Sequence, residues 1–490
     1  MRRGVCLTDC SWINRLPHFD GEIAVDGKWL DIAELDFGKV RRHRPLAVLK
    51  PANSDDVVTA INFCRSEKIP LAARGHAHSA GGQMMVRGGL VIDMKSMDKI
   101  CEITDDFVIV EGGIAWSEVL YAAIDRGLTP PVVTDWLSVS VGGTVSMGGF
   151  GFMSFHRGTQ MDHLLELEVV TGTGEKIVCS PSENTEIFDL VRGTHGQFAL
   201  ITKAKIPLEP APDSVRMVQA AYGSVDDLLS DINRLSKLHK VDLIHGFAAE
   251  KTPESVMTRM NSTDKMNLDR NLVESALENL DGNWVYNLEI SDLQGANLKG
   301  PRADLSKLKH LSGCIDIWEI SWKEFCFRLP PLIIEEELQG AAPHPELTVF
   351  IPFSEDGLEL MKSEFERLQP IADIGGGPVL FFPLNSRLIT APYLRLPLNE
   401  HSFFFGLLRR ATPPTSERIN QQILDNESIY KRVLDVGGVR YLPDTLPENQ
   451  EFWVHHFDKL WPRLQSYKSR FDPDGIFVGS FGEFLQNTSD

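Results

Sequence analysis

The sequence predicts an α+β protein with two differently built parts. Up to about residue 212, short apolar strands alternate with amphipathic helices, and three glycine-rich stretches interrupt the series. Beyond that point these stretches stop, and strand-like runs alternate with longer helix-like ones, which is typical of a sheet covered by helices. The change coincides with a cluster of prolines, Pro207, Pro210 and Pro212, which indicates a domain boundary.

The composition favours a protein that handles small molecules. A chain of 490 residues with 42% hydrophobic and 24% charged residues is long enough for two or more cores and has the balance of an ordinary globular protein. Its 49 Lys and Arg residues against 68 Asp and Glu residues give a net charge of -19, which repels nucleic acid and anionic membranes. We therefore expect a small-molecule partner, no nucleic acid and no membrane.

The N-terminal residues and the cysteines favour a cytoplasmic protein. No continuous apolar segment follows Arg2 and Arg3, so this start does not resemble a secretory signal, and no later segment reads as a membrane span. The seven cysteines are odd in number and scattered. Cys6 and Cys10 could pair or hold a metal, but no second cluster supports a zinc site, so we expect free thiols and no metal.

Local patterns place the elements of the N-terminal part. Ser54 stands as a helix N-cap before an amphipathic run, and Gly127 stops a later helix. A glycine-containing turn at 172–174 joins two strand-like runs. The expected order is a strand at 46–49, a helix at 57–66, a strand ending at Met94, a hairpin at 101–111, a helix at 116–125, a hairpin at 165–178 and a strand at 200–206.

The second part is expected to form one sheet with helices on one face. Short apolar runs predict its strands, and longer stretches with helical periodicity predict its helices. The strands are expected at 243–248, 284–290, 315–320, 347–351, 379–382 and 403–408, and the helices at 225–238, 357–368 and 418–433.

The three glycine-rich stretches, at 73–83, 129–151 and 193–198, indicate a binding site. Small residues let the backbone approach a large ligand and lay N–H groups against phosphates. The first stretch has neither the G-x-G-x-x-G nor the G-x-x-x-x-G-K-[ST] spacing of the common nucleotide motifs. By itself it could be an ordinary connection with two incidental histidines, His76 and His78.

Together, the motifs resemble the vanillyl-alcohol-oxidase (PCMH-type) family of FAD enzymes and, within it, the cytokinin dehydrogenases. The run Arg74-Gly75-His76-Ala77-His78-Ser79, followed by Gly82-Gln83, is similar to the family's R-G-x-G-H-S-x-x-G-Q loop. Residues 134–144 are similar to its T-D-Y-L-x-x-T-V-G-G-T segment, and 193–202 to its G-G-L-G-Q-F-G-I-I-T segment. A P-H-P motif at 343–345 and an F-D-P motif at 471–473 also match, so the resemblance covers most of the chain.

The resemblance implies a PCMH-type FAD-binding domain, made of two α+β subdomains, and an α+β substrate or cap domain over the flavin. With the proline boundary, it implies domains at 1–212 and 213–440, and a segment at 441–490 that returns to the FAD-binding domain. His78 takes the position of the histidine that carries FAD covalently through the isoalloxazine 8-methyl group. The residues expected to contact the cofactor are Ala73, Gly75, His76, Ala77, His78, Ser79, Gln83, Asp135, Ser140, Gly142, Gly143, Ser146, Phe150, Ile201 and Tyr441.

The resemblance also assigns catalytic and substrate residues. Asp135 falls on the family's substrate-binding aspartate, which makes it a hydrogen-bond acceptor and base, although an aspartate in such a turn more often caps a backbone N–H. The family's partner glutamate is replaced by His245, either a proton shuttle or an ordinary buried histidine. Glu346 and Thr348 stand where the family has tryptophan and asparagine, so a carboxylate and a hydroxyl are expected beside Phe404 in the substrate pocket.

The flavin machinery thus resembles the family's, whereas the substrate pocket departs from it. We expect a covalent-FAD oxidoreductase that oxidises a C–N or C–OH bond of a small molecule, with an amine unlike the isoprenoid adenines as its substrate. The alternatives are a true cytokinin dehydrogenase, an alcohol or sugar oxidase on the same scaffold, and a flavoprotein that has lost catalysis. Oxygen or a quinone is the expected electron acceptor, and the sequence favours no oligomeric state.

Overall fold

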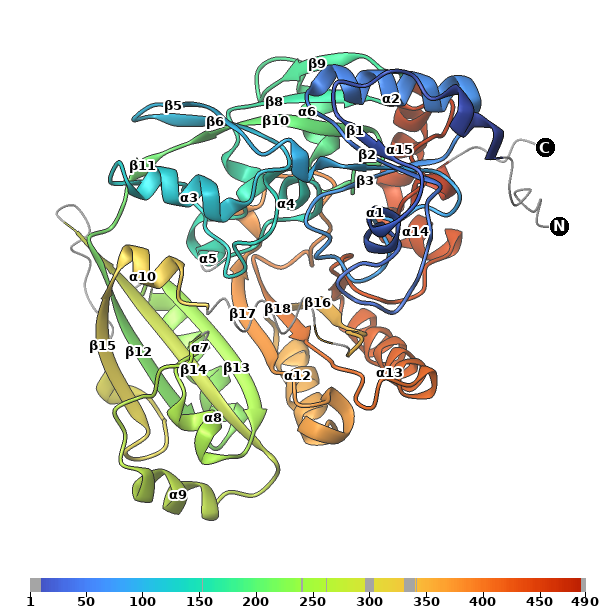
Figure 1. Ribbon diagram of the computed structural model, residues 1–490. Helices are drawn as coiled ribbons and strands as arrows, with labels where there is room; N and C mark the ends of the chain where they lie inside the picture. Colours follow the sequence, from blue (N-terminus) through green and yellow to red (C-terminus); the bar gives the residue numbers. More distant parts are fainter. Residues whose placement is uncertain are drawn as a thin grey trace.

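The structure is a computed structural model that describes residues 10–151, 153–238, 241–260, 262–295, 304–329, 340 and 342–485 (Figure 1). Within these residues the strands form four sheets, of four, five, two and eight strands. The eight strands of the largest sheet lie between Ser214 and Arg440, and Figure 1 shows this sheet apart from the smaller ones. The predicted α+β class is confirmed.

The first sheet precedes and supports the first glycine-rich stretch. Its strands are β1 (Glu22–Ala24), β2 (Ala47–Lys50), β3 (Leu71–Arg74) and β4 (Leu90–Asp93), and its helices are α1 (Lys28–Ala33) and α2 (Ser54–Glu67). In the order β1-β2-β4-β3, the last three strands are parallel and β1 is antiparallel. Val57, Ile61 and Cys64 are buried in one core with the strands, so α2 covers the sheet.

The N-cap of α2 is Asn53, so the prediction of Ser54 is wrong. The Asn53 side-chain oxygen accepts hydrogen bonds from the backbone N–H groups of Asp55 (2.9 Å) and Asp56 (3.0 Å). Ser54 is instead the first helical residue, and its hydroxyl donates to Glu168 of the second sheet (2.5 Å). Asn and Ser cap helices about equally well, so tertiary contacts decided between two adjacent candidates.

The second sheet contains both predicted hairpins. Its strands are β5 (Ile100–Ile103), β6 (Phe107–Glu111), β8 (Glu166–Thr171), β9 (Lys176–Cys179) and β10 (Ala199–Pro207), antiparallel in the order β5-β6-β10-β8-β9. The accompanying helices are α3 (Trp116–Ile124), α4 (Val141–Met147), α5 (Ser154–Arg157) and α6 (Thr185–Val191). The second glycine-rich stretch is therefore not loop throughout, because it contains α4.

The proline cluster leads from the smaller sheets into the large one. β11 (Glu209–Pro210) pairs with β7 (Leu128–Thr129) in a two-stranded ribbon. The next strand of the large sheet starts at Ser214, directly after this ribbon. Pro210 lies at the end of a very short strand, where a missing backbone N–H disturbs little of the pairing.

The large sheet is antiparallel at every pairing, in the order β15-β12-β14-β13-β17-β18-β16-β19. Its strands are β12 (Ser214–Tyr222), β13 (Leu243–Glu250), β14 (Trp284–Gln294), β15 (Ile315–Ser321), β16 (Leu347–Pro352), β17 (Val379–Asn385), β18 (His401–Leu407) and β19 (Val439–Arg440). The helices are α7 (Val225–Leu238), α8 (Pro253–Met257), α9 (Arg270–Glu278), α10 (Trp322–Cys326), α12 (Glu355–Arg367) and α13 (Ser416–Asp435).

Successive side chains along the strands of the large sheet point to opposite faces of it. Phe381, Phe403 and Phe405 pack in one core with α7, α12 and α13. Their neighbours Phe382 and Phe404 belong to the opposite face, because side chains alternate along a strand. We call this opposite face the cavity face. The expectation of helices on one face only is incomplete. α8 and α9 pack against buried residues of β12 and β14 that alternate with those facing α7, and so they lie on the opposite face.

The C-terminal helices α14 (Gln450–Phe457) and α15 (Trp461–Phe471) lie beside the N-terminal elements (Figure 1). Trp453 and Leu464 share a core with residues of α4 and α6. Leu71 of β3 donates its backbone N–H to the carbonyl of Ile476 (2.7 Å). The chain thus returns to the first sheet after the large one, while the domain limits at 212 and 440 stay predictions.

The described residues also bear on the cysteines and on membrane association. Cys64, Cys101, Cys179, Cys314 and Cys326 are free thiols. Cys6, and with it the proposed pairing with Cys10, lies outside the described residues. None of the described helices is both long and apolar enough to cross a membrane.

Candidate active site

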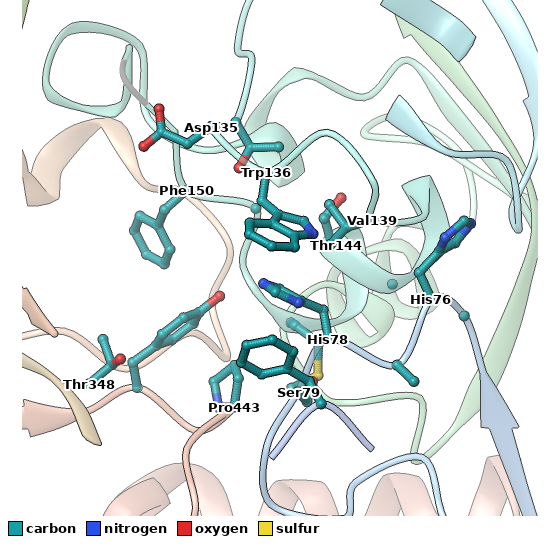
Figure 2. A pocket seen from close by; sticks show the side chains of 18 of the residues that line it. His76, His78, Ser79, Asp135, Trp136, Val139, Thr144, Phe150, Thr348 and Pro443 are labelled. Carbon is teal, nitrogen blue, oxygen red and sulfur yellow. The ribbon is translucent and has the colours of Figure 1, made fainter. Parts of the chain in front are cut away.

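A cavity of about 650 Å³ lies where the glycine-rich stretches meet the cavity face of the large sheet (Figure 2). It brings together residues from all three stretches and from β16 and β18. All the residues predicted to contact cofactor or substrate line it, apart from His245: Ala73, Gly75, His76, Ala77, His78, Ser79, Gln83, Asp135, Ser140, Gly142, Gly143, Ser146, Phe150, Ile201, Glu346, Thr348, Phe404 and Tyr441.

His78 sits in an aromatic stack at the cavity wall. Its ring stacks on Trp136 with centroids 4.7 Å apart and lies 4.5 Å from Phe37, which stacks in turn on His344 at 4.5 Å. The His78 Nδ1 atom is enclosed and has no hydrogen-bond partner among the described residues. Burial, with His344 and His76 nearby, lowers the pKa of His78 to about 4. The imidazole is therefore neutral and nucleophilic at pH 7.

His76 occupies a different environment on the same stretch. Figure 2 shows its ring apart from the stack of His78 and Trp136. Its pKa is lowered by burial and by Lys95, and the backbone of Gly113 hydrogen-bonds to it. Between them, Ala77 adopts the left-handed conformation (φ 59°), and its carbonyl accepts the N–H of Phe37 (2.9 Å). This turn separates the directions of the two histidines.

Asp135 stands in the cavity wall between a cation and an imidazole. One carboxylate oxygen, Oδ1, lies 3.9 Å from Nη2 of Arg328, and the other, Oδ2, lies 3.8 Å from Nε2 of His245. Oδ1 has no hydrogen-bond partner among the described residues, so Asp135 is not a loop cap through this atom. Burial is the main cause that raises the pKa of Asp135, Arg328 opposes it, and Glu289 adds to it. Together they bring the pKa of Asp135 to about 7.

His245 lies behind Asp135, on β13. It is 3% exposed, its ring centroid is 4.8 Å from that of Phe382, and it pairs across the strands with Glu289 of β14. Burial and the Arg328 charge lower the pKa of His245 to about 3. It is therefore a neutral imidazole within reach of Asp135, at a distance longer than a direct hydrogen bond.

Known protein families match both parts of the chain. Residues 45–180 match the family described as an FAD binding domain, and residues 212–482 match the family described as "Cytokinin dehydrogenase 1, FAD and cytokinin binding". The chain belongs to the cytokinin dehydrogenase family of FAD-dependent oxidoreductases. The PCMH-type fold and the FAD cofactor indicated by the sequence motifs are confirmed.

Individual relatives cover nearly the whole chain. An uncharacterized oxidoreductase from the fasciation locus of Rhodococcoides fascians is 31% identical over 93% of this chain and 97% of its own length. Cytokinin dehydrogenase 5 of Arabidopsis thaliana is 31% identical over 94% of this chain and 89% of its own. Cytokinin dehydrogenase 9 of Oryza sativa subsp. japonica is 30% identical, with 93% and 90% covered.

The glycines fit this cytokinin dehydrogenase-type site for a reason beyond ligand access. A Cβ atom at Gly75 would lie 2.2 Å from the Ser140 hydroxyl oxygen. Ser140 is the N-cap of α4 and accepts the N–H of Gly143 (3.3 Å). At Gly142 a Cβ would lie 2.9 Å from the Gly112 carbonyl oxygen. Gly75 therefore lets the first stretch pack against the second, and Gly142 lets the second stretch pack against the backbone that follows β6, whereas the sequence suggested that the glycines serve the ligand directly.

Gly75→Ala is expected to weaken FAD binding roughly 5- to 150-fold, because overpacking of about 1–3 kcal/mol would separate the two stretches. Reversible binding is best measured by flavin fluorescence in a His78→Ala background, where no tether forms. The double change with Ser140→Ala should recover part of the affinity, since it removes the overlapping oxygen, and Ser140→Ala alone is the control. Unchanged affinity in Gly75→Ala would show that the contact is unimportant.

The part of the cavity predicted to bind substrate is aromatic and includes a carboxyl group that is mostly neutral. Phe382 and Phe404 stack with centroids 4.6 Å apart and planes at 11°. Tyr441 meets Phe150 edge-on at 5.2 Å. Burial and Asp444 raise the pKa of Glu346 to about 8. The expected carboxylate at Glu346 is therefore mostly a neutral carboxyl group at pH 7, because the enclosed position disfavours its charge.

The sequence did not indicate two charged residues next to Asp135. Arg328 donates to Glu289 at 2.8 Å, and both are buried. Glu289 could have been noticed as a carboxylate in the otherwise uncharged centre of a buried strand, where an unpaired charge is costly. Arg328 lies outside any motif, and its position depends on how the segment after α10 folds back onto the sheet.

Proposed function

We propose that this chain carries FAD covalently on His78 and oxidises the C–N bond of a small secondary amine, with Asp135 as the proton acceptor. The placement of Asp135 carries the proposal. It borders the same cavity as His78, its Oδ1 accepts no hydrogen bond from the residues that the structure describes, and its pKa is about 7. A base is most effective when its pKa lies near the working pH.

The environment of His78 supports the tether. The enclosed, unpartnered Nδ1 of a neutral imidazole is suited to bond to the 8-methyl carbon of the isoalloxazine ring. Forming this N–C bond would remove one hydrogen from the imidazole and one from the methyl group. Dioxygen would take up the two electrons and two protons released and become hydrogen peroxide.

Asp135 would act on the amine nitrogen. When bound, FAD supplies the acceptor for a hydride from the carbon next to that nitrogen. Asp135 accepts the N–H hydrogen bond, which holds the C–H bond in place, and then takes the proton. The substrate loses two electrons and two protons in total and becomes an imine. His245, neutral and 3.8 Å from Asp135, is placed to pass the proton onward.

N6-substituted adenines are the first substrates to consider. Relatives that match nearly the whole chain carry the name cytokinin dehydrogenase. A flat purine also suits the aromatic face formed by Phe382 and Phe404. The second candidate is an amine without a purine ring. Its support is that His245 stands where the family has a second acid and that Glu346 is mostly neutral, which alters the groups offered to ring nitrogens.

Anaerobic flavin bleaching distinguishes these candidates. Isopentenyladenine, a series of simple secondary amines and a series of polyols are each mixed with the purified protein, and the flavin band is followed. Bleaching of the flavin by an amine supports the proposal. The amine that bleaches it fastest identifies the substrate class. Bleaching by polyols alone would make the protein an alcohol or sugar oxidase. Reoxidation with oxygen and with a quinone then identifies the electron acceptor.

A further inference from the structure

We propose that Arg328 and Glu289 are positioning residues that act through Asp135: Arg328 favours the anionic form that accepts a proton, and Glu289 opposes it, so that the two together set how readily Asp135 takes the proton. This inference rests on the role given to Asp135 in the proposed function. Neither residue belongs to the cavity lining, so neither is placed to touch the substrate. Their effect must therefore reach the reaction through the carboxylate beside them.

One guanidinium is shared between two buried carboxylates. Nη2 of Arg328 lies 2.8 Å from Oε1 of Glu289 and 3.9 Å from Oδ1 of Asp135. The side chain of Arg328 is 8% exposed and that of Glu289 is 3% exposed. The guanidinium also lies over the ring of Phe325 at 4.3 Å, which fixes its plane. The short bond to Glu289 anchors Arg328, whereas the distance of 3.9 Å to Asp135 is too long for a direct hydrogen bond to that carboxylate.

The two partners act on Asp135 with opposite sign. Arg328 favours the charged carboxylate and lowers its pKa, whereas Glu289 disfavours a second negative charge and raises it. The other titratable group beside Asp135, His245 on β13, is neutral and lies 3.8 Å away. Arg328 and Glu289 are thus the charged side chains that act on Asp135. Their opposite effects set how strongly its carboxylate binds a proton.

This arrangement differs from a purely structural ion pair in its consequences. A comparable pair links neighbouring strands of the same sheet, since Arg216 of β12 lies 2.9 Å from Asp292 of β14. Neither of these residues lines the cavity. If Arg328 and Glu289 served only to join the sheet, changes to either pair would have the same consequences for stability and none for the pH dependence of turnover.

The test is the acidic limb of kcat/KM, which reports ionisation in the free enzyme. It is measured with the amine that bleaches the wild-type flavin. Arg328→Gln is expected to move this limb to higher pH by about one to three units, the range for an opposite charge at this distance. Glu289→Gln, which keeps an oxygen for Arg328, is expected to move it to lower pH. Arg328→Lys should stay close to wild type, and Arg216→Gln should leave the limb in place.

Opposite shifts in Arg328→Gln and Glu289→Gln are the signature that a structural role would not produce. Shifts in the same direction, or none in either variant, overturn the inference. If Arg328→Gln does not fold, Glu289→Gln and Arg328→Lys still decide, because both preserve the local packing. Asp135→Asn separates the two proposals: if it turns over normally the proposed function fails, and if it is inactive while the limbs do not move, only this inference fails.

Discussion

Asp135→Asn is expected to lower the rate of flavin reduction by about 10²- to 10⁴-fold, the usual contribution of a positioned general base. Asparagine has nearly the shape of aspartate, so the cavity should keep its form. Its amide oxygen can still accept a hydrogen bond but cannot take a proton at neutral pH. Stopped-flow absorbance at the flavin band measures the rate, and an unchanged flavin spectrum before mixing verifies that the site is intact.

The pH dependence of the wild-type protein provides a second test of Asp135 as the base. Asp135 must be ionised to accept the proton, and its pKa is raised to about 7 by burial. Activity should therefore rise as the pH increases through about 7 and level off above it, and Asp135→Asn should flatten this limb. Asp292→Asn, which changes a carboxylate of β14 that lies outside the cavity lining, is the matched control and should keep both rate and limb. Full turnover in Asp135→Asn would remove Asp135 as the base.

Most strands of the large sheet could be predicted because their apolar runs are local and bounded by turns. The exceptions are the two-residue β19 and the longer β12. β12 begins two residues after Pro212 and includes Arg216 and Gln219. These polar residues hide the strand in a sequence pattern. They are tolerated because Arg216 pairs with Asp292 of β14, and the Gln219 side chain bonds to the backbone at 258 and 260. Helix α4 escaped prediction for a related reason, because Gly142 and Gly143 have poor helix propensity and tertiary packing overrides it.

The candidate site likewise contains residues that the sequence could indicate and residues that it could not. His78 and Asp135 lie in contiguous motifs, so a resemblance carried by neighbouring residues was enough to indicate them. Glu289 and Arg328 reach Asp135 only through strand pairing and a returning segment, which no local pattern encodes. The protonation of Glu346 could not be predicted either, because it depends on the enclosure of the side chain and on Asp444 nearby.

His78→Ala is expected to abolish the covalent attachment of flavin while leaving a folded protein that binds FAD reversibly. The alanine removes the enclosed Nδ1 but retains the glycine-rich stretches that form the cavity. Acid precipitation of the wild-type protein should give a yellow pellet. The same treatment of His78→Ala should give a colourless pellet and free FAD in the supernatant, and mass spectrometry should show loss of the mass added by FAD.

His76→Ala is the matched control for this prediction, because it changes a histidine two residues away on the same stretch. The His76 ring lies apart from the stack that holds His78 (Figure 2). The backbone of Gly113 already hydrogen-bonds to this ring. This variant should therefore keep the yellow pellet. A yellow pellet from His78→Ala would contradict the tether, and a colourless pellet from His76→Ala alone would move the anchor to His76. If only His78→Ala loses the tether, the difference between the two histidines follows from the left-handed turn at Ala77, which places one imidazole in the aromatic stack and the other outside it.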